Sequence, residues 1–486
     1  MLCCLCAPHP WRYLDDTVCL SKQRDLVDEP RQAEAPEELE RRAKMRVKMK
    51  LIATALSALA ALSIASSPSA GVNPGDTITK DQADKVADLV SPGNLVLVKQ
   101  GMTMKIVPTG RLEWPPPYKS ATEKYSPQVN LAPDGTLKGY AAGLPFPLVD
   151  SNDPQAAQKV MWNFSYRPLY TDDAIAKNVE LASYRPGSAP ADPVEHFTIG
   201  NVGFYNNTGR TEVNPIPTNS DALAAGIRYR FGAYPVLEPS ELRGFGLIRY
   251  RNMDPKIEDN SWMSTPSSRR VRRISANELS DVLGMYDAGF GGGSGAASYA
   301  SNLDPDSFFG FAAKIEDFNY KLLGEKSMLA VANAANSPAK LCEGDGGRTI
   351  CPENWEMRRV YVIEADAKQT SLLGSGVSIP KRIFYIDSEG WFITASDQYD
   401  REGKLWKTLA TFNAYRDRPV PDARVAIWPF KRMFQTALVD EDVTNGFSTV
   451  LLSPGFETEE HEGWYINMGV ASDNFFNPVT MSNAAH

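Results

Sequence analysis

Histidine and cysteine are scarce in this chain, which removes much of the chemistry that depends on them. Among 486 residues there are only four histidines and six cysteines. Beyond residue 70 the histidines are His196, His461 and His486, which stand far apart and lack the HExxH spacing of a zinc site. There is also no GxSxG stretch to mark a serine nucleophile. We therefore expect no metal site, no cofactor and no catalytic residue, and we expect that the protein is not an enzyme.

Long apolar runs are also missing, since a membrane-spanning helix needs about 20 apolar residues. The nearest approach, from Leu51 to about Ala65, follows a basic stretch and precedes a run of small residues. This order is typical of a secretory signal, so we interpret 45–70 as a cleaved signal peptide and predict a periplasmic protein. Residues 1–44 are interpreted as an over-extended start or a disordered extension. No cysteine lies at the expected cleavage site, so the protein should not be lipid-anchored.

An excess of positive charge is absent as well. The formal net charge is −8, which argues against nucleic acid as a partner. The length after the signal allows one large domain or two. We expect an N-terminal part of helix, strands and irregular covering segment at 71–194 and a curved sheet domain at 195–486, with a single domain over 71–486 as the alternative.

Only two cysteines follow the predicted signal peptide, Cys342 and Cys351, with a polar, glycine-containing loop between them. Two cysteines alone cannot complete a tetrahedral metal site. In an oxidising periplasm such a pair is most simply a disulfide, and we predict that bond.

Helical signals are few and fall near the start of the mature chain. A capping box formed by Thr79 and Gln82 predicts a helix over 80–90. The next stretch, 94–108, predicts a pair of strands. Three consecutive prolines at 115–117 predict irregular structure that lies over a surface.

From about residue 195 onward, β-branched and aromatic residues alternate with polar ones, which predicts strands. Short polar turns such as 387–390 and 400–403 join them, so an antiparallel meander is expected. Helical patterns interrupt the strands at 275–285 and 322–335. The expected strands lie within 195–207, 243–254, 259–274, 355–366, 381–387, 390–400 and 404–416.

Alternating strands offer one apolar face, which something must cover. We expect the few helices and the proline-rich segment to do so, leaving an apolar groove. Aromatic side chains in or beside the strands are candidates to line it, although packing in the core is the simpler explanation for any one of them. The candidates are Trp162, Trp262, Phe308, Phe311, Tyr320 and Trp391.

The run SSRRVRRIS is the one unusual cluster of charge. It is either an edge strand whose arginines discourage aggregation or an anchor for an anionic head group or an acidic partner. On a strand, Arg270 and Arg272 would face one way and Arg269 and Arg273 the other.

Several segments, taken together, resemble a family of exported proteobacterial proteins known as domain of unknown function 1329. The most specific are the run in 259–275 and the hairpin KRIFYIDSEGWFITASDQYDREGKLWK; the others are GYAAGLPFP, VMWNFSYRP, GFAAKIEDFNYKLLGEK and WEMRRVYVIEA. The family is described as similar to outer-membrane lipoprotein-sorting proteins. The resemblance implies a mainly β, α+β fold: a strongly curved antiparallel sheet, an incomplete barrel, with helices covering its concave face.

The resemblance further implies traffic of lipids or other hydrophobic compounds, with an outer-membrane protein and a hydrophobe exporter as partners. We therefore expect a carrier or chaperone that binds a hydrophobic or lipid-like ligand in an apolar groove. An envelope interaction or sensor protein that binds an outer-membrane partner is the first alternative. An envelope lipid or ester hydrolase is the second, and it would need a nucleophile close to His196 or His461.

Overall fold

The computed structural model describes residues 71–265, 270–274, 311, 314–368, 381–421, 424–453 and 463–484. The chain from Ala70 to His486 forms one compact unit. The predicted signal peptide, Arg269, Phe308, His461 and the helical pattern at 275–285 lie outside the described residues.

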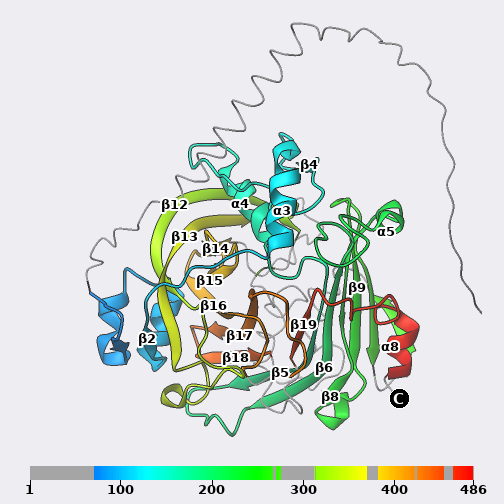
Figure 1. Ribbon diagram of the computed structural model, residues 1–486. Coiled ribbons are helices and arrows are strands. Elements are labelled where there is room, and N and C mark those ends of the chain that lie inside the picture. Colours follow the sequence, from blue (N-terminus) through cyan, green and yellow to red (C-terminus); the bar gives the residue numbers. More distant parts are fainter. Residues whose placement is uncertain are drawn as a thin grey trace, which may run out of the picture. The chain divides into compact units, whose positions relative to one another are not determined.

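One large sheet of seventeen described strands dominates this unit (Figure 1). Its antiparallel pairings run from β12 through β13, β14, β15, β16, β17 and β18 to β5, and on through β6, β7, β9 and β10 to β11. The sheet is mixed, because β2 (Met104–Ile106) pairs parallel with the start of β13, and it is not closed into a barrel. The main strands are β5 (Asp173–Tyr184), β6 (Glu195–Asn206), β7 (Ile227–Ala233), β9 (Gly246–Asn252), β10 (Asn260–Thr265), β11 (Arg270–Ile274), β12 (Phe318–Ala330), β13 (Glu353–Ala367), β14 (Lys381–Asp387), β15 (Ile393–Tyr399), β16 (Leu405–Arg416), β17 (Arg432–Asp442) and β18 (Phe447–Leu452).

Shorter strands extend this sheet or stand beside it. β1 (Thr77–Ile78) pairs with β2, β8 (Val236–Glu238) with β6, and β19 (Trp464–Ile466) with β5. A separate ribbon is formed by β3 (Asn130–Leu131) and β4 (Leu137–Lys138). The antiparallel meander expected from the hairpin-length turns is therefore found from β12 to β18.

The hairpin between β14 and β15 shows how the sequence encodes one of these turns. Asp387 ends β14, and its carboxylate accepts hydrogen bonds from the backbone N–H groups of Glu389 and Gly390. Its own carbonyl accepts from Trp391, whose φ is 57°. An aspartate that bonds to the backbone two residues on is a typical turn former, and the expected turn at 387–390 is present.

The helix expected over 80–90 is a 3-10 helix, η1 (Lys80–Val86), and the Thr79 side chain makes no cap hydrogen bond to it. The strand pair expected at 94–108 is wrong in its first half, which forms α2 (Pro92–Gln100). Ser91 starts α2, since its hydroxyl accepts from the Asn94 N–H, and Pro92 suits the first turn. The apolar run in this helix looked like a strand because periodicity does not separate short buried helices from strands.

Two other expectations also fail. The prolines at 115–117 do not prevent regular structure, because α3 (Pro116–Tyr125) begins within them, where their fixed φ is already helical. The helical pattern at 322–335 is a strand, since β12 pairs with β13 along most of its length. Pairing with a long neighbour overrides the local signal there.

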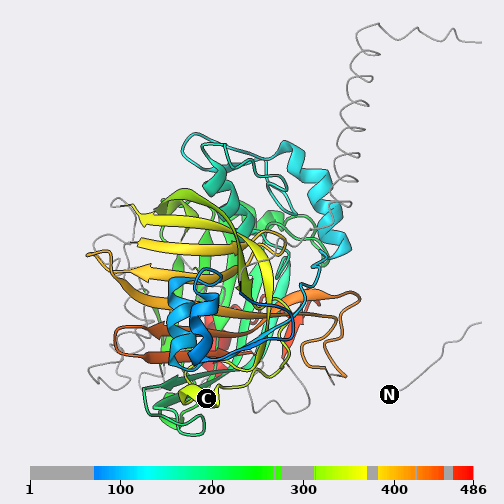
Figure 2. The same cartoon turned by 90° about the vertical axis from the view of Figure 1, so that its left-hand side faces the viewer.

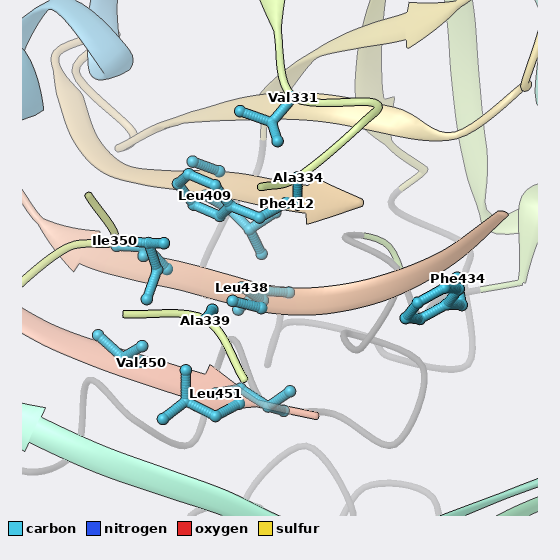
Figure 3. Packing of buried hydrophobic residues seen from close by; sticks show 14 of the residues in the cluster. Val331, Ala334, Ala339, Ile350, Leu409, Phe412, Phe434, Leu438, Val450 and Leu451 are labelled. Atoms are coloured by element: carbon cyan, nitrogen blue, oxygen red, sulfur yellow. The ribbon is translucent and has the colours of Figure 1, made fainter. Parts of the chain in front are cut away.

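Helix α2 packs against β15 and β16, and η1 packs against α2, on the face turned away from β5 to β9, as the two views agree (Figure 2). The segment between β12 and β13 lies on this region too, with Val331, Ala334 and Ile350 against the buried Leu409 and Phe412 (Figure 3). The expectation that helices cover the concave face is therefore not confirmed for η1 and α2.

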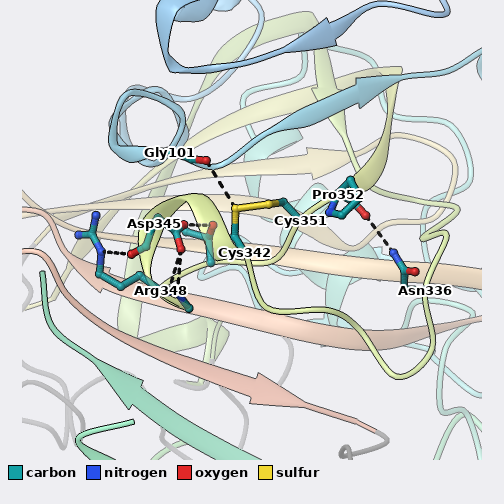
Figure 4. The surroundings of a disulfide bond; sticks show 9 residues. Gly101, Asn336, Cys342, Asp345, Arg348, Cys351 and Pro352 are labelled. Atoms are coloured by element: carbon teal, nitrogen blue, oxygen red, sulfur yellow. Dashed lines mark hydrogen bonds between the residues drawn. A yellow bond between two sulfur atoms is a disulfide. The ribbon is translucent and has the colours of Figure 1, made fainter. Parts of the chain in front are cut away.

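The predicted disulfide Cys342–Cys351 is present in this covering segment (Figure 4). The Cys342 Sγ lies 3.5 Å from the carbonyl oxygen of Gly101, the residue that follows α2. Within the closed loop, the Asp345 carboxylate accepts from the N–H groups of Gly347 and Arg348. The disulfide loop therefore packs against the end of α2.

Candidate functional site

A cavity of about 110 Å³ lies at the C-terminal end of α4 (Ala156–Ser165). Its walls come from the end of α4, the segment that follows it, strands β6, β7 and β9, and residues near η5 (Ile315–Asp317). The lining residues are Tyr140, Phe164, Ser165, Tyr166, Arg167, Leu169, Tyr170, Thr171, Phe204, Asn206, Thr208, Gly209, Arg228, Tyr229, Arg251, Phe311 and Ile315.

Helix α4 is held in place by packing and by one buried amide. Its residues Val160 and Met161 are fully buried and belong to a hydrophobic cluster with Ile363 and Phe384 of the sheet. The Asn163 side chain, also fully buried, accepts from the Phe146 N–H and donates to the Phe146 carbonyl. Burying an amide with both groups satisfied fixes the helix relative to the preceding segment.

Aromatic rings form much of the cavity wall. The rings of Tyr140 and Tyr166 lie 3.9 Å apart between centroids, and those of Tyr170 and Phe204 stack at 6.1 Å. The ring centroids of Phe164 and Phe311 lie 6.5 Å apart. Such rings supply large apolar area with little rotamer freedom to lose, so the cavity suits an apolar group.

The tyrosine hydroxyls of this wall remain protonated near neutral pH. Burial raises the pKa of Tyr140 well above its ordinary value, and burial also raises the pKa of Tyr166 and of Tyr170. The Tyr140 hydroxyl donates to the Gly143 carbonyl at 2.9 Å. Because these groups stay neutral, they add no negative charge to the cavity.

Three arginines bring positive charge to the wall. The Arg251 Nε lies 2.6 Å from an Asp259 carboxylate oxygen, so an anion already pairs with it. Arg167 donates to the Phe164 carbonyl at 2.6 Å. Arg228 donates to the Ser165 hydroxyl, and its guanidinium carbon lies 4.7 Å from the centroid of the Tyr166 ring.

A buried polar network holds the wall segment next to Gly209. Arg210 is fully buried and donates to the backbone carbonyls of Pro215, Asp172, Asn206, Val213 and Asn214. The Asp172 carboxylate accepts from three successive N–H groups, those of Thr211, Glu212 and Val213. These bonds satisfy the polar groups of an irregular buried segment, as burial requires, and so they shape one side of the cavity.

The aromatic residues predicted from the sequence are partly brought together. Trp162, Phe311 and Trp391 belong to one buried cluster, and Tyr320 packs against it. Of these, only Phe311 lines the cavity. Trp262 does not join them: it packs against Tyr250 at 4.9 Å, in a cluster that includes a residue of the C-terminal helix α8 (Pro478–Ala484).

The predicted arginine cluster does not reach the cavity. Arg270, Arg272 and Arg273 are exposed on β11 and are not among the lining residues. The register places Arg272 opposite Met263 and Arg273 opposite Trp262, so the two arginines face opposite ways, as their spacing predicted. Arg273 also donates to the Asn260 side chain.

The arginines that line the cavity were not predicted from the sequence. A signal was available, because the tetrapeptide Ile-Arg-Tyr-Arg occurs at 227–230 and again at 248–251, on strands β7 and β9 that pair with each other. An irregularity in their register lies between Ile227 and Tyr229, on either side of Arg228. Sequence alone does not reveal such a bulge, which changes the direction in which a side chain points.

Metal binding receives no support from the described residues. Among them no group of three histidine, cysteine, aspartate or glutamate side chains could hold a metal ion. His196 lies 3.4 Å from a Glu180 carboxylate oxygen.

The candidate site is therefore a cavity of aromatic and basic residues beside an open, mixed sheet. The chain belongs to the family described as protein of unknown function DUF1329, whose model matches residues 77–440. A Pseudomonas aeruginosa protein, the uncharacterized protein PA3922, is 24% identical over 427 residues, which is 85% of this chain and 82% of the relative.

Solved structures resemble the chain more distantly. A DUF1329 family protein from Desulfovibrio piger and a Vibrio parahaemolyticus domain provisionally assigned as an outer membrane lipoprotein-sorting protein each match with a TM-score of 0.37 and 15% identity. Each match covers 64% of this chain and 92% of the other. Scores this low carry no argument about function. Within the described residues, no helix has the length and apolar character to cross a bilayer.

Proposed function

We propose that this protein is a periplasmic carrier that binds a hydrophobic, lipid-like molecule by one end, seated in the cavity beside α4. The observation that supports this most is a cavity of about 110 Å³ with several aromatic rings in its wall, in a family member with an exported-type sequence. An apolar cavity of about 150 Å³ is enough to bind benzene. The space found here is smaller, so in this conformation it holds at most one small group of a ligand and not a whole lipid.

Helix α4 and the segment after it are the part that has to move for a larger ligand. They supply Phe164, Tyr166 and Tyr170 to the wall, and α4 packs on β12. In this proposal α3 and α4 cover the concave side of the sheet and shift to admit the rest of the molecule. Burial supplies about 25 cal/mol per Å² of apolar area, so release needs a partner, such as an outer-membrane protein, that favours the displaced helices.

Native mass spectrometry on Gly71–His486, purified from periplasm without detergent, tests the proposal, with an organic extract of the same sample analysed beside it. We expect a stoichiometric apolar adduct that is lost on denaturation. A clean mass for the protein alone, with no uptake of added fatty acids, phospholipids or sterols, would contradict the carrier. The envelope interaction protein would then be the better hypothesis, and pull-down of an outer-membrane protein its test.

A further inference from the structure

We infer that the ligand is an anionic amphiphile and that Arg228 binds its carboxylate or phosphate head group. The inference rests on the proposed carrier function, because it assigns the chemical class of the molecule that this cavity takes.

Arg228 differs from Arg251, another arginine of the cavity, because no carboxylate of the described residues forms an ion pair with Arg228. Its polar contacts are with the Ser165 and Tyr166 side chains, and its guanidinium carbon lies 5.5 Å from the Trp162 ring centroid and 4.7 Å from that of Tyr166. Among the residues that the structure describes, no carboxylate forms an ion pair with it, whereas Arg251 pairs with Asp259 at 2.6 Å. Glu316 acts on Arg228 electrostatically without forming such a pair.

Arg228 is half-buried, and withdrawing a cation from water costs free energy unless an anion pairs with it. Two aromatic faces lower this cost only in part, because cation–π contacts are weaker than a close ion pair. The planar guanidinium has donors arranged to bind a carboxylate or a phosphate through two hydrogen bonds. An anionic head group in the cavity would therefore supply the charge that Arg228 lacks.

The aromatic residues of the same wall favour an apolar body for the rest of the ligand. Phe164, Tyr166, Tyr170, Phe204 and Phe311 border the space that Arg228 enters, and their hydroxyls, where present, stay neutral. A cavity of about 110 Å³ admits a head group and the first carbons attached to it. The charge and the aromatic wall together favour one molecule with an acidic head and an apolar body over a free anion.

Probes that share one ten-carbon alkyl chain and differ in the head group separate the contribution of the charge from that of the apolar body. We would measure binding of decanoate, decyl phosphate, 1-decanol and decyltrimethylammonium to Gly71–His486 by calorimetry at neutral pH and low salt, with acetate and inorganic phosphate as free anions. We expect at least one acidic probe to bind about 10- to 100-fold more tightly than decanol, the range that a charge-assisted hydrogen-bonded pair supplies, and the free anions to bind far more weakly.

Variants of the protein then test whether the preference for acidic probes depends on Arg228. In Arg228→Gln the advantage of the acidic probe over decanol should disappear while decanol binding is retained, and in Arg228→Lys part of the advantage should return. Arg272→Gln on β11 is the matched control, because it removes an exposed arginine from the cluster predicted by sequence. Decanol binding shows that the variant is folded, so a loss of stability is not mistaken for a loss of selectivity.

The outcomes are distinguishable. If decanol and the acidic probes bind equally, the carrier stands and the anionic class is wrong. If only Arg272→Gln loses the acidic preference, the head-group site is on β11 and not at Arg228. If acetate or phosphate binds as tightly as the amphiphiles, the cavity is a small-anion site. If no probe binds at all, the carrier function itself fails, and this inference with it.

Discussion

Arg358 and Asp387 form a buried, two-bonded ion pair across the neighbouring strands β13 and β14. The Arg358 Nε and Nη2 donate to the two carboxylate oxygens of Asp387 at 2.7 and 3.2 Å, and both side chains are almost fully buried. Arg358 also donates to the Gly110 carbonyl and pairs with Glu389 at 2.9 Å. The pair therefore ties the β14–β15 hairpin to the chain segment that leads into α3.

Arg358→Ala should lower the free energy of unfolding by about 3–5 kcal/mol, because it leaves the Asp387 carboxylate buried without its partner. Urea unfolding of Gly71–His486 followed by tryptophan fluorescence measures the change. Arg359→Ala is the control. Arg359 is the next residue in the chain, is largely exposed and pairs with Glu325, so the expected cost is below about 1 kcal/mol. Equal losses in the two variants would show that the buried pair has no special role.

Asp397 should make stability depend on pH. It lies under α2, where its carboxylate accepts from the Ser91 and Thr408 hydroxyls, the Gly93 N–H and the Tyr385 hydroxyl. Burial raises its pKa to about 6. Since the folded pKa exceeds the unfolded one, the folded state binds the proton more tightly. Stability from this group is then fully present below about pH 4 and lost as pH rises through 6.

Asp397→Asn removes the titratable carboxyl group and keeps an acceptor oxygen. The free energy of unfolding should therefore lose up to about 3 kcal/mol of its pH dependence between pH 4 and 7. The measurement is the free energy of unfolding at several pH values. Burial also raises the pKa of Glu441, to about 7, so a second slope of similar size should remain in the variant and extend to about pH 7. The exposed Glu402→Gln serves as the control for simple removal of a negative charge, and an unchanged profile in Asp397→Asn would refute the assignment.

Reducing the Cys342–Cys351 bond should destabilise the protein by about 3 kcal/mol or less, because the loop it closes is short. The loss should be visible as a lower melting temperature in reductant and as faster hydrogen exchange near Gly101, where Cys342 contacts the end of α2. The double variant Cys342→Ser, Cys351→Ser should melt at the same temperature with and without reductant. A reductant effect that persists in it would point away from this bond.

Substitution of an aromatic residue should weaken ligand uptake only where that residue lines the cavity. Phe311→Leu removes a ring from the cavity wall and should weaken uptake of the endogenous apolar adduct several-fold. Trp262→Leu alters a separate cluster with Tyr250 and Met481, so it should change stability without changing uptake. Native mass spectrometry of both variants measures this, and a loss of adduct only in Trp262→Leu would place the site elsewhere.

The sequence by itself determined the β-rich class, the strands that were expected after residue 195, the β14–β15 hairpin and the disulfide. These follow from local rules: alternation of side chains, turn formers such as Asp387, and two cysteines close together beyond residue 70. Local rules failed in α2 and β12, where the outcome for a short apolar run and for a helical pattern was decided by partners distant in the chain. They also left β7, β17 and β18 unpredicted.

Only the tertiary structure decided which residues meet at the cavity. Trp162 and Phe311 come together across about 150 residues of chain, while the equally aromatic Trp262 lies in another cluster. The exposed arginines of β11 were conspicuous in the sequence, yet Arg228 reaches the cavity because it lies at an irregularity in the pairing of β7 with β9. Burial and strand register are properties of the assembled sheet, so the repeated Ile-Arg-Tyr-Arg could draw attention to Arg228 but could not place it at the cavity.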